Sequence, residues 1–325
     1  MASSSAATPP PPPPSWVHFT NARVLFDRTI SPLGALEVLC EDGAVVAVDA
    51  PFAVSALRPP STALSVVDVD CGGLILAPGF IDIQFNGGWG TAFTDAALNS
   101  VDVACVAERL AAEAGVTSFV ATVVTCTPDT ASASALAIAE AKAQAQSRRP
   151  RHKPQSELLG VHMEGPCLCP SKKGAHDELL LRAPSALLAP APANASPPNA
   201  PLPITPPSLF GSFDLAAFDG VRMITLAPDL PGAREAIASL AARGVVVSLG
   251  HSPATMAQGI DALDAGATCL THLFNAMAPL HHREVGKDVN CILQTPRDPV
   301  YCAFRNPCIV LSRYTFVPHT PPEVF

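Results

Sequence analysis

The stretch that decides the fold is LLGVHMEGP, residues 158–166 of the 325-residue chain. A short apolar run that ends in polar residues is typical of a strand buried in a parallel sheet. Five further runs have this character, so the sequence predicts six buried strands. The further runs are residues 74–83, 118–125, 221–226, 245–249 and 268–273.

Helical stretches separate these runs. They are residues 101–114, 130–146, 232–243 and 254–265. Pro253 stands at the start of the last one, a favoured position for proline where helices begin. Strands that alternate with helices predict an α/β fold with a parallel sheet and right-handed crossovers.

The chain before residue 72 follows another pattern. A hairpin turn at Glu41-Asp42-Gly43 separates two of its short β-type runs. We therefore expect residues 16–71 to form a small β-domain, and the proline-rich residues 1–15 to form an extended arm before it. The β-type runs are residues 22–26, 35–40 and 44–48.

Two later segments interrupt the strand–helix alternation. Residues 183–212 are rich in proline, which excludes a helix or a central strand and predicts an inserted surface loop. From Lys287 to Phe325 the alternation stops and prolines recur, so we expect neither helices nor barrel strands there.

Composition excludes several functional classes. A net charge of −8 argues against a general nucleic-acid binder, because such proteins neutralise phosphates. No run approaches the roughly 20 apolar residues of a membrane span, and residues 1–15 do not resemble a secretory signal. The ten cysteines show no spacing typical of a disulfide framework. We therefore expect reduced thiols and a cytoplasmic protein.

Polar residues follow four of the predicted strands, at the point where each strand ends. Gln84 and Asn86 follow the first strand, Glu164 the third, His251 the fifth and His272 the sixth. The carboxyl ends of parallel barrel strands meet at one face, where active sites are built. The sequence therefore predicts one site assembled from separate strands.

Glu164, His251 and His272 suit one divalent metal ion. A carboxylate and two imidazoles leave positions open for water, which is the catalytic pattern of zinc or ferrous iron. Cobalt and manganese also fit such a ligand set. His162 lies two residues before Glu164 and shares its face of the strand, so we interpret it as a neighbour that supports the ligands.

Hydrolysis at a metal site also needs a base that takes a proton from water. An acidic residue on a late strand would fill this role. None of the acids after His272 follows a predicted barrel strand, so we assign no catalytic residue. These acids are Glu284, Asp288, Asp298 and Glu323.

Five separated motifs, in order, resemble those of N-acetylglucosamine-6-phosphate deacetylases, a family of amidohydrolases, and the resemblance covers residues 17–286. Gln84-x-Asn86 stands where most amidohydrolases carry His-x-His, which implies one metal ion and places both side chains beside it. The motifs are APGFIDIQFNG at 77–87, GVHMEGP at 160–166, KGAH at 173–176, LGHS at 249–252 and THLFNAM at 271–277.

The resemblance implies a metal-dependent (β/α)8 barrel over residues 72–286, incomplete at about six strands, with a small N-terminal β-sandwich. The implied reaction is hydrolysis of N-acetyl-D-glucosamine 6-phosphate to D-glucosamine 6-phosphate and acetate in amino-sugar catabolism. The implied substrate contacts are Ala175, His176, Asn275, Ala276 and Arg283. Arg283 would bind the phosphate across the interface of a homodimer.

Residues 287–325 depart from the family pattern. They lack its seventh and eighth strands, its aspartate base and the strands that complete its sandwich. We therefore expect a poorly stable chain with less than about one-thousandth of the family's activity. Two alternatives stay open: another amidohydrolase of the dihydroorotase or deaminase type, and a non-catalytic truncated isoform.

Overall fold

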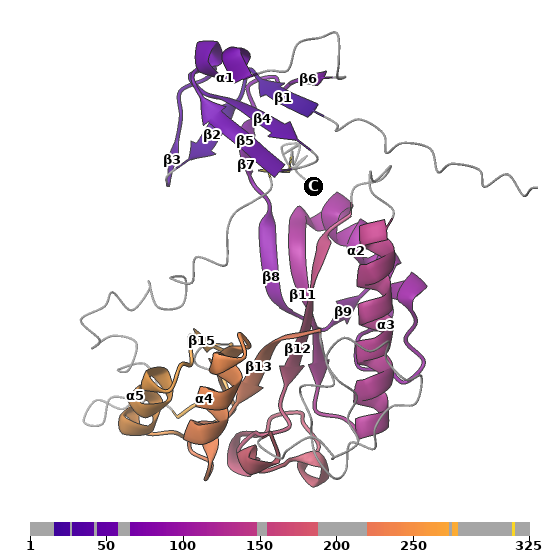
Figure 1. Ribbon diagram of the computed structural model, residues 1–325, viewed down its shortest axis with the longest axis vertical. Coiled ribbons are helices and arrows are strands. Elements are labelled where there is room, and N and C mark those ends of the chain that lie inside the picture. Colours follow the sequence, from indigo (N-terminus) through magenta and orange to yellow (C-terminus); the bar gives the residue numbers. More distant parts are fainter. Residues whose placement is uncertain are drawn as a thin grey trace, which may run out of the picture.

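A computed structural model describes residues 16–26, 28–41, 44–57, 66–147, 155–187, 220–272 and 275–278, together with the backbone of 314–315. Figure 1 shows a small β-rich part joined through β8 to a larger part of strands and helices. The functional residues predicted from the sequence belong to the larger part wherever they are described, and Arg283 lies outside the described residues.

The larger part is built on a six-stranded sheet in the order β15-β14-β13-β12-β11-β8. Every neighbouring pair of strands is parallel, which confirms the predicted α/β architecture. The sheet curls as part of a barrel, with β8 and β15 as its two ends (Figure 1). Its strands are β8 Phe80–Phe85, β11 Val116–Val124, β12 Glu157–Glu164, β13 Val221–Leu226, β14 Val246–Leu249 and β15 Cys269–Leu270.

Four helices join these strands in the described part of the chain, close to where the sequence predicts them. They are α2 Ser100–Ala114, α3 Pro128–Ser147, α4 Ala233–Ala242 and α5 Met256–Asp264. The expected start of α5 at Pro253 is wrong. Thr255 and Gln258 form a capping box, which satisfies the first free amides and starts the helix at Met256.

The main core lies between the helices and the sheet. Val103, Val106 and Leu110 repeat at helical spacing on α2 and are buried there. Ile237 and Leu240 do the same on α4. These apolar faces hold the strands in place, so the strand ends that carry the polar residues are fixed as well.

Two four-stranded sheets make up the N-terminal part, in the orders β5-β4-β1-β6 and β16-β7-β2-β3. Glu41 and Ala44 pair across the predicted hairpin. Buried side chains from both sheets share one core, as in a β-sandwich. The elements are β1 Trp16–Thr20, β2 Arg23–Phe26, β3 Thr29–Ile30, β4 Glu37–Glu41, β5 Ala44–Asp49, α1 Pro51–Leu57, β6 Val66–Asp70, β7 Ile75–Pro78 and β16 Tyr314–Thr315.

The strand predicted at residues 74–83 is in fact two strands in two different sheets. β7 pairs with β2 of the sandwich, whereas β8 pairs with β11 of the large sheet. The chain changes sheets at Gly79, where a Cβ atom would lie 2.1 Å from the Thr117 Cγ2 atom. A continuous apolar run does not show where one sheet ends and the next begins, so the sandwich extends beyond the boundary predicted at residue 72.

The described residues of the C-terminal segment 287–325 form a short strand that the sequence does not predict. Tyr314 and Thr315 pair antiparallel with Pro78 and Ala77, which adds β16 to the edge of the sandwich. Tyrosine and threonine favour strands, but a stretch of two residues is too short a pattern to be recognised. The rest of this segment, like the arm at residues 1–15, lies outside the described residues.

The predicted loop at 183–212 begins with a turn of 3-10 helix, η3 Pro184–Leu187, whose two end residues are buried. The remainder of this segment lies outside the described residues. Two shorter 3-10 turns, η1 Pro170–Lys172 and η2 Glu178–Leu180, follow β12, and a small hairpin of β9 Gly87–Gly88 and β10 Thr91–Ala92 follows β8. In the described part of the chain, every helix is too short or too polar to cross a membrane.

Candidate metal centre

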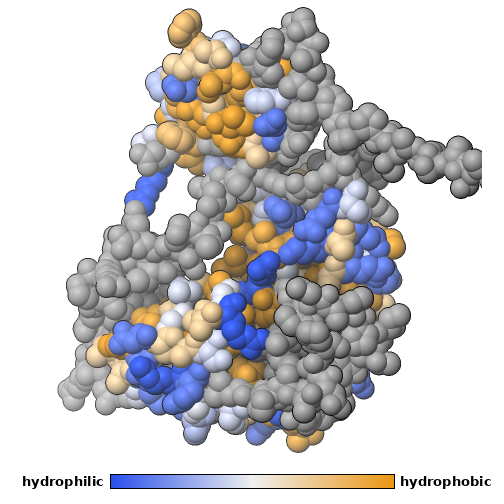
Figure 2. All heavy atoms as spheres, viewed as in Figure 1, coloured by the Kyte–Doolittle hydropathy of each residue, from blue (hydrophilic) through white to orange (hydrophobic). Residues whose placement is uncertain are grey.

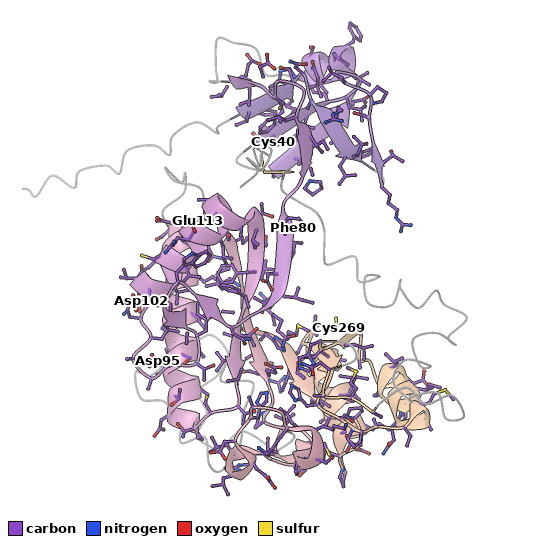
Figure 3. All side chains as sticks on the ribbon, turned by 180° about the vertical axis from the view of Figure 1, so that it is seen from behind. Cys40, Phe80, Asp95, Asp102, Glu113 and Cys269 are labelled. Carbon is purple, nitrogen blue, oxygen red and sulfur yellow. The ribbon has the colours of Figure 1, made fainter. Side chains whose placement is uncertain are left out.

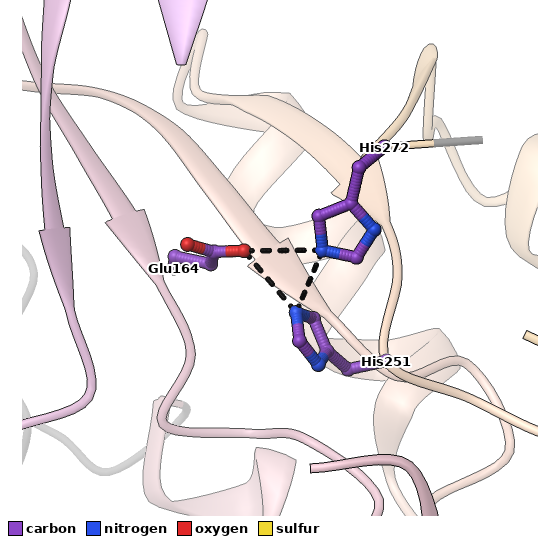
Figure 4. A group of neighbouring side chains, drawn as sticks. All are labelled: Glu164, His251 and His272. Carbon is purple, nitrogen blue, oxygen red and sulfur yellow. Dashed lines mark hydrogen bonds and ion pairs between the residues drawn. The ribbon is translucent and has the colours of Figure 1, made fainter. Parts of the chain in front are cut away.

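Glu164, His251 and His272 meet at the carboxyl ends of three strands (Figure 4). Glu164 is the last residue of β12, and the two histidines follow β14 and β15. The His251 Nε2 atom lies 3.1 Å from Glu164 Oε1, and His272 Nε2 lies 3.4 Å from the same oxygen. The two Nε2 atoms are 2.9 Å apart. The structure therefore brings together the three residues that the sequence proposes as ligands.

Both histidines have backbone conformations that residues with side chains rarely adopt. His251 has a φ of 52° and His272 a φ of 30°. Each such conformation costs on the order of 1–3 kcal/mol and persists only where its surroundings enforce it. For His251 the enforcement is visible, because its carbonyl accepts a hydrogen bond from the Cys169 N–H at 3.1 Å. The turn redirects the imidazole from the strand toward Glu164.

Hydrogen bonds on the far side of each ring define its tautomer. His251 Nδ1 lies 2.9 Å from the Lys172 carbonyl oxygen, and His272 Nδ1 lies 3.2 Å from the Asn275 carbonyl oxygen. A carbonyl only accepts, so both Nδ1 atoms carry protons. In the neutral rings, each Nε2 atom then presents a lone pair.

Two imidazole lone pairs and a carboxylate oxygen therefore face one another without a proton donor between them. Such a set repels itself unless a cation lies at its centre. Two atoms bound to zinc at tetrahedral angles are about 3.3 Å apart, close to the separations of 3.1 and 3.4 Å from Glu164 to the two histidines. The donor set thus fits a divalent metal ion.

The charge of Glu164 is supported by its neighbours. Burial alone would raise the pKa of this carboxyl, but the nearby imidazoles of His251, His176 and His162 hold the pKa below its usual value. Gln84 on β8 donates a hydrogen bond from Nε2 to Glu164 Oε1 at 3.0 Å. Glu164 is therefore ionised and oriented, as a metal ligand must be.

The other two predicted neighbours of the metal site, His162 and Asn86, make hydrogen-bond contacts with other groups. His162 is fully buried, and its ring nitrogens contact the hydroxyls of Thr122 at 3.2 Å and Thr225 at 2.8 Å. Burial lowers its pKa to about 4, so the ring is neutral at physiological pH. Asn86 follows β8, where its carbonyl accepts a hydrogen bond from the Phe93 N–H at 3.0 Å.

A buried layer of hydroxyl groups lies next to the candidate ligands. The sequence analysis does not predict this layer. Thr225 Oγ1 lies 2.6 Å from Thr271 Oγ1, which in turn lies 2.7 Å from Ser248 Oγ. Together with Thr122 and His162, these groups connect neighbouring strands across the concave face. The sequence does contain threonine and serine within these apolar strand runs. A single hydroxyl residue in a strand is common, so none of them indicates a buried hydroxyl layer by itself.

Of the residues implied as substrate contacts, His176 and Asn275 contact the candidate ligands His251 and His272. The ring of His176 stands edge-on to the ring of His251, with centroids 4.7 Å apart, and burial lowers its pKa. Ala175 is exposed beside it. Asn275 and Ala276 form the turn after His272, while Arg283 lies outside the described residues.

Two comparisons with known proteins agree on one family. No protein-family model matches the chain. The human N-acetylglucosamine-6-phosphate deacetylase is 42% identical over 228 residues, which cover 67% of this chain and 46% of the human protein. The crystal structure of the Pasteurella multocida enzyme of that name superposes with a TM-score of 0.64 at 25% identity, over 86% of this chain and 62% of that chain. The chain belongs to this family.

A further N-acetylglucosamine-6-phosphate deacetylase, from Mycobacterium smegmatis, has been solved as a mutant in complex with N-acetyl-D-glucosamine-6-phosphate. It superposes with a TM-score of 0.59 at 29% identity, over 87% of this chain and 61% of that chain. The chain spans about half the length of the curated relatives it matches. Membership of the deacetylase family confirms the resemblance found in the sequence motifs.

Proposed function

We propose that this protein acts in metal-dependent hydrolysis of N-acetyl-D-glucosamine 6-phosphate to D-glucosamine 6-phosphate and acetate. The observation that carries the proposal is the set of three facing lone pairs on Glu164, His251 and His272, at the ends of three strands. Its structural relatives from Pasteurella multocida and Mycobacterium smegmatis are deacetylases of the same sugar phosphate.

One divalent ion, of zinc, iron, cobalt or manganese, would be held by these three residues. When bound, it supplies Lewis acidity, which polarises an amide carbonyl and acidifies water. The Lys172 and Asn275 carbonyls keep the Nδ1 protons in place, so both Nε2 atoms stay available. Gln84 holds the carboxylate of Glu164 in the orientation that faces them.

His176 is suited to accept a hydrogen bond from a sugar hydroxyl. The Thr125 hydroxyl donates to the Glu164 carbonyl at 3.1 Å, so at 2.9 Å it can only accept from His176 Nδ1. With the proton on Nδ1 and a lowered pKa, the neutral ring presents its Nε2 lone pair. Ala175, Asn275 and Ala276 would line the same side, and Arg283 would bind the phosphate across a homodimer interface.

A general base is the component that we do not find among the described residues. Within the described residues, no second carboxylate is hydrogen-bonded to the three ligands. We therefore favour slow turnover, below about one-thousandth of the family's rate, because general-base catalysis contributes about 10²–10⁴-fold. The same observation supports a second candidate function, in which the protein binds the metal ion and the sugar phosphate without catalysis. The net charge of −8 favours a small-molecule ligand over nucleic acid, and the cysteine pattern favours the cytoplasm.

The purified full chain tests this proposal. We expect one equivalent of divalent metal ion by mass spectrometry, saturable binding of D-glucosamine 6-phosphate, and slow acetate release from the acetylated sugar phosphate. A chain that binds no metal ion would contradict the proposal. Acetate release without measurable slowing would contradict the missing base, and hydrolysis of cyclic amides instead would favour an amidohydrolase of another type.

A further inference from the structure

The η1 turn, Pro170–Lys172, lies against the metal centre, and its side chains have no part in the proposed function. Its backbone holds His251 at two points. Cys169, which precedes the turn, donates its N–H to the His251 carbonyl, and the Lys172 carbonyl accepts from His251 Nδ1 at 2.9 Å. The turn therefore determines both the backbone position and the tautomer of this ligand.

The side chain of Lys172 reaches in another direction. Its ammonium donates to the Met277 carbonyl at 2.9 Å, which links two positions 105 residues apart. Lys172 is half-buried and Met277 is buried, so this hydrogen bond is partly shielded from water. A hydrogen bond from a charged donor is roughly twice as strong as one between neutral groups.

Met277 ends the turn that carries Asn275 and Ala276, the residues implied as substrate contacts. Ala276 has a φ of 52°, a conformation that must be enforced. The Ser252 N–H donates a hydrogen bond to the Ala276 carbonyl at 3.1 Å. The turn is thus held at two successive carbonyls, one by Ser252 and one by Lys172.

We propose that Lys172 is a positioning residue that couples the metal centre to the sugar-binding turn. Its carbonyl orients His251, and its ammonium fixes Asn275 and Ala276 at the correct distance from that ligand. This inference rests on the proposed function, because it takes a phosphorylated amino sugar as the molecule that Asn275 and Ala276 contact. Two separate atoms of one residue therefore serve metal binding and sugar binding.

Lys172→Met separates the two roles, because it removes the ammonium and keeps the backbone carbonyl. With the full chain loaded with zinc, we expect one equivalent of zinc as in the native chain. Hydrogen exchange at the amides of residues 275–278 should rise about tenfold, and the Kd for D-glucosamine 6-phosphate should rise about tenfold, as expected for one lost charged hydrogen bond. Lys172→Arg, which retains a donor, should restore the Kd to within about threefold of native.

Lys173→Met is the matched control for charge. The Lys173 ammonium lies one residue away and donates to the His176 carbonyl at 3.2 Å, not to the turn. We expect it to leave exchange at residues 275–278 unchanged. If both variants weaken sugar-phosphate binding equally and neither changes that exchange, Lys172 acts only through its charge and the inference is wrong.

Zinc content and sugar-phosphate binding test the other parts of the proposal. Loss of zinc in Lys172→Met would contradict the division of roles between carbonyl and ammonium. Failure of the native chain to bind D-glucosamine 6-phosphate would overturn the proposed function. Exchange at residues 275–278 would still report whether Lys172 holds the turn, so the two failures are distinguishable.

Discussion

His162 and Glu164 show how strongly one residue's surroundings determine its chemistry. They lie two positions apart on the same strand face, yet one faces a buried layer of hydroxyls and the other faces two imidazoles. Burial keeps His162 neutral, whereas its neighbours keep Glu164 ionised. Spacing along the strand predicts the shared face but not these opposite environments, because the partners come from strands distant in sequence.

The lowered pKa of His162 predicts a pH dependence of stability. Folded His162 binds its proton less tightly than the unfolded chain does, since its pKa falls from 6.5 to about 4. The unfolded state therefore binds more protons in this window, and the free energy of unfolding drops as the pH falls from 6.5 to about 4, by roughly 3 kcal/mol in total. Urea denaturation of the metal-free chain at several pH values measures this change.

His162→Gln provides the comparison, because glutamine can contact both threonine hydroxyls but does not titrate. We expect a flatter dependence between pH 6.5 and about 4. His176, whose pKa burial also lowers, is present in both chains and cancels in the difference. Identical slopes for the two chains would show that His162 is not the titrating group.

Gln84 and Glu164 allow a graded test of the ligand set. Glu164→Gln removes the carboxylate, so stoichiometric zinc binding should be lost. Gln84→Leu keeps all three ligands but removes the hydrogen bond to Glu164 Oε1, and metal affinity should fall about 10–100-fold. Competition with a zinc chelator measures both. Equal affinities for Gln84→Leu and the native chain would mean that Gln84 does not orient the carboxylate.

At the scale of elements, Gly79 separates two strands that belong to different sheets. β7 ends at Pro78 and β8 begins at Phe80, which lies where the two parts of the molecule join (Figure 3). Any side chain at residue 79 would collide with Thr117 on β11. The glycine thus permits the close approach that lets the chain leave the sandwich and enter the barrel sheet.

Gly79→Ala should therefore destabilise the protein by about 1–3 kcal/mol, as overpacking does. Gly220→Ala is the control, because no atom lies within 4 Å of the Cβ position there. Urea midpoints compare the two variants with the native chain. Adding Thr117→Ser, which removes the nearest colliding atom, should recover part of the loss. A Gly79→Ala midpoint equal to that of Gly220→Ala would contradict the packing described at this crossing.

The elements also show what local sequence can predict. Strands β11 to β14 and helices α2 to α4 lie within a few residues of their predicted positions, because apolar periodicity and length distinguish them. The split at Gly79 and the late start of α5 depend on contacts with Thr117 and on the Thr255–Gln258 capping box. The split at Gly79 depends on a contact between segments distant in sequence. The start of α5 depends on which nearby residue caps the helix, and the position of Pro253 alone does not show this.

At the scale of the whole molecule, the described sheet has two ends, β8 and β15, that are not paired with each other. A closed barrel has no such ends. Phe80 at one end has 70% of its surface exposed, and apolar residues also gather on the visible face of the N-terminal strands (Figure 2). Unpaired edge strands and exposed apolar surface favour association between copies of the chain.

We therefore expect the apparent mass of the chain in solution to increase with protein concentration. Light scattering across a concentration series measures it, and Phe80→Lys should reduce the association by placing a charge at the open strand. Val101→Lys is the control, because Val101 is 65% exposed and belongs to α2 instead of an end strand of the sheet. If the control reduces association as much, the open end of the sheet is not responsible.

The central claim is that Glu164, His251 and His272 together hold one divalent metal ion. Anomalous diffraction at the zinc edge from crystals of the zinc-loaded chain tests it most directly. We expect one strong peak about 2.0–2.2 Å from a Glu164 carboxylate oxygen and from the Nε2 atoms of both histidines. A zinc peak bound through other residues, or no peak at the three strand ends, would contradict it.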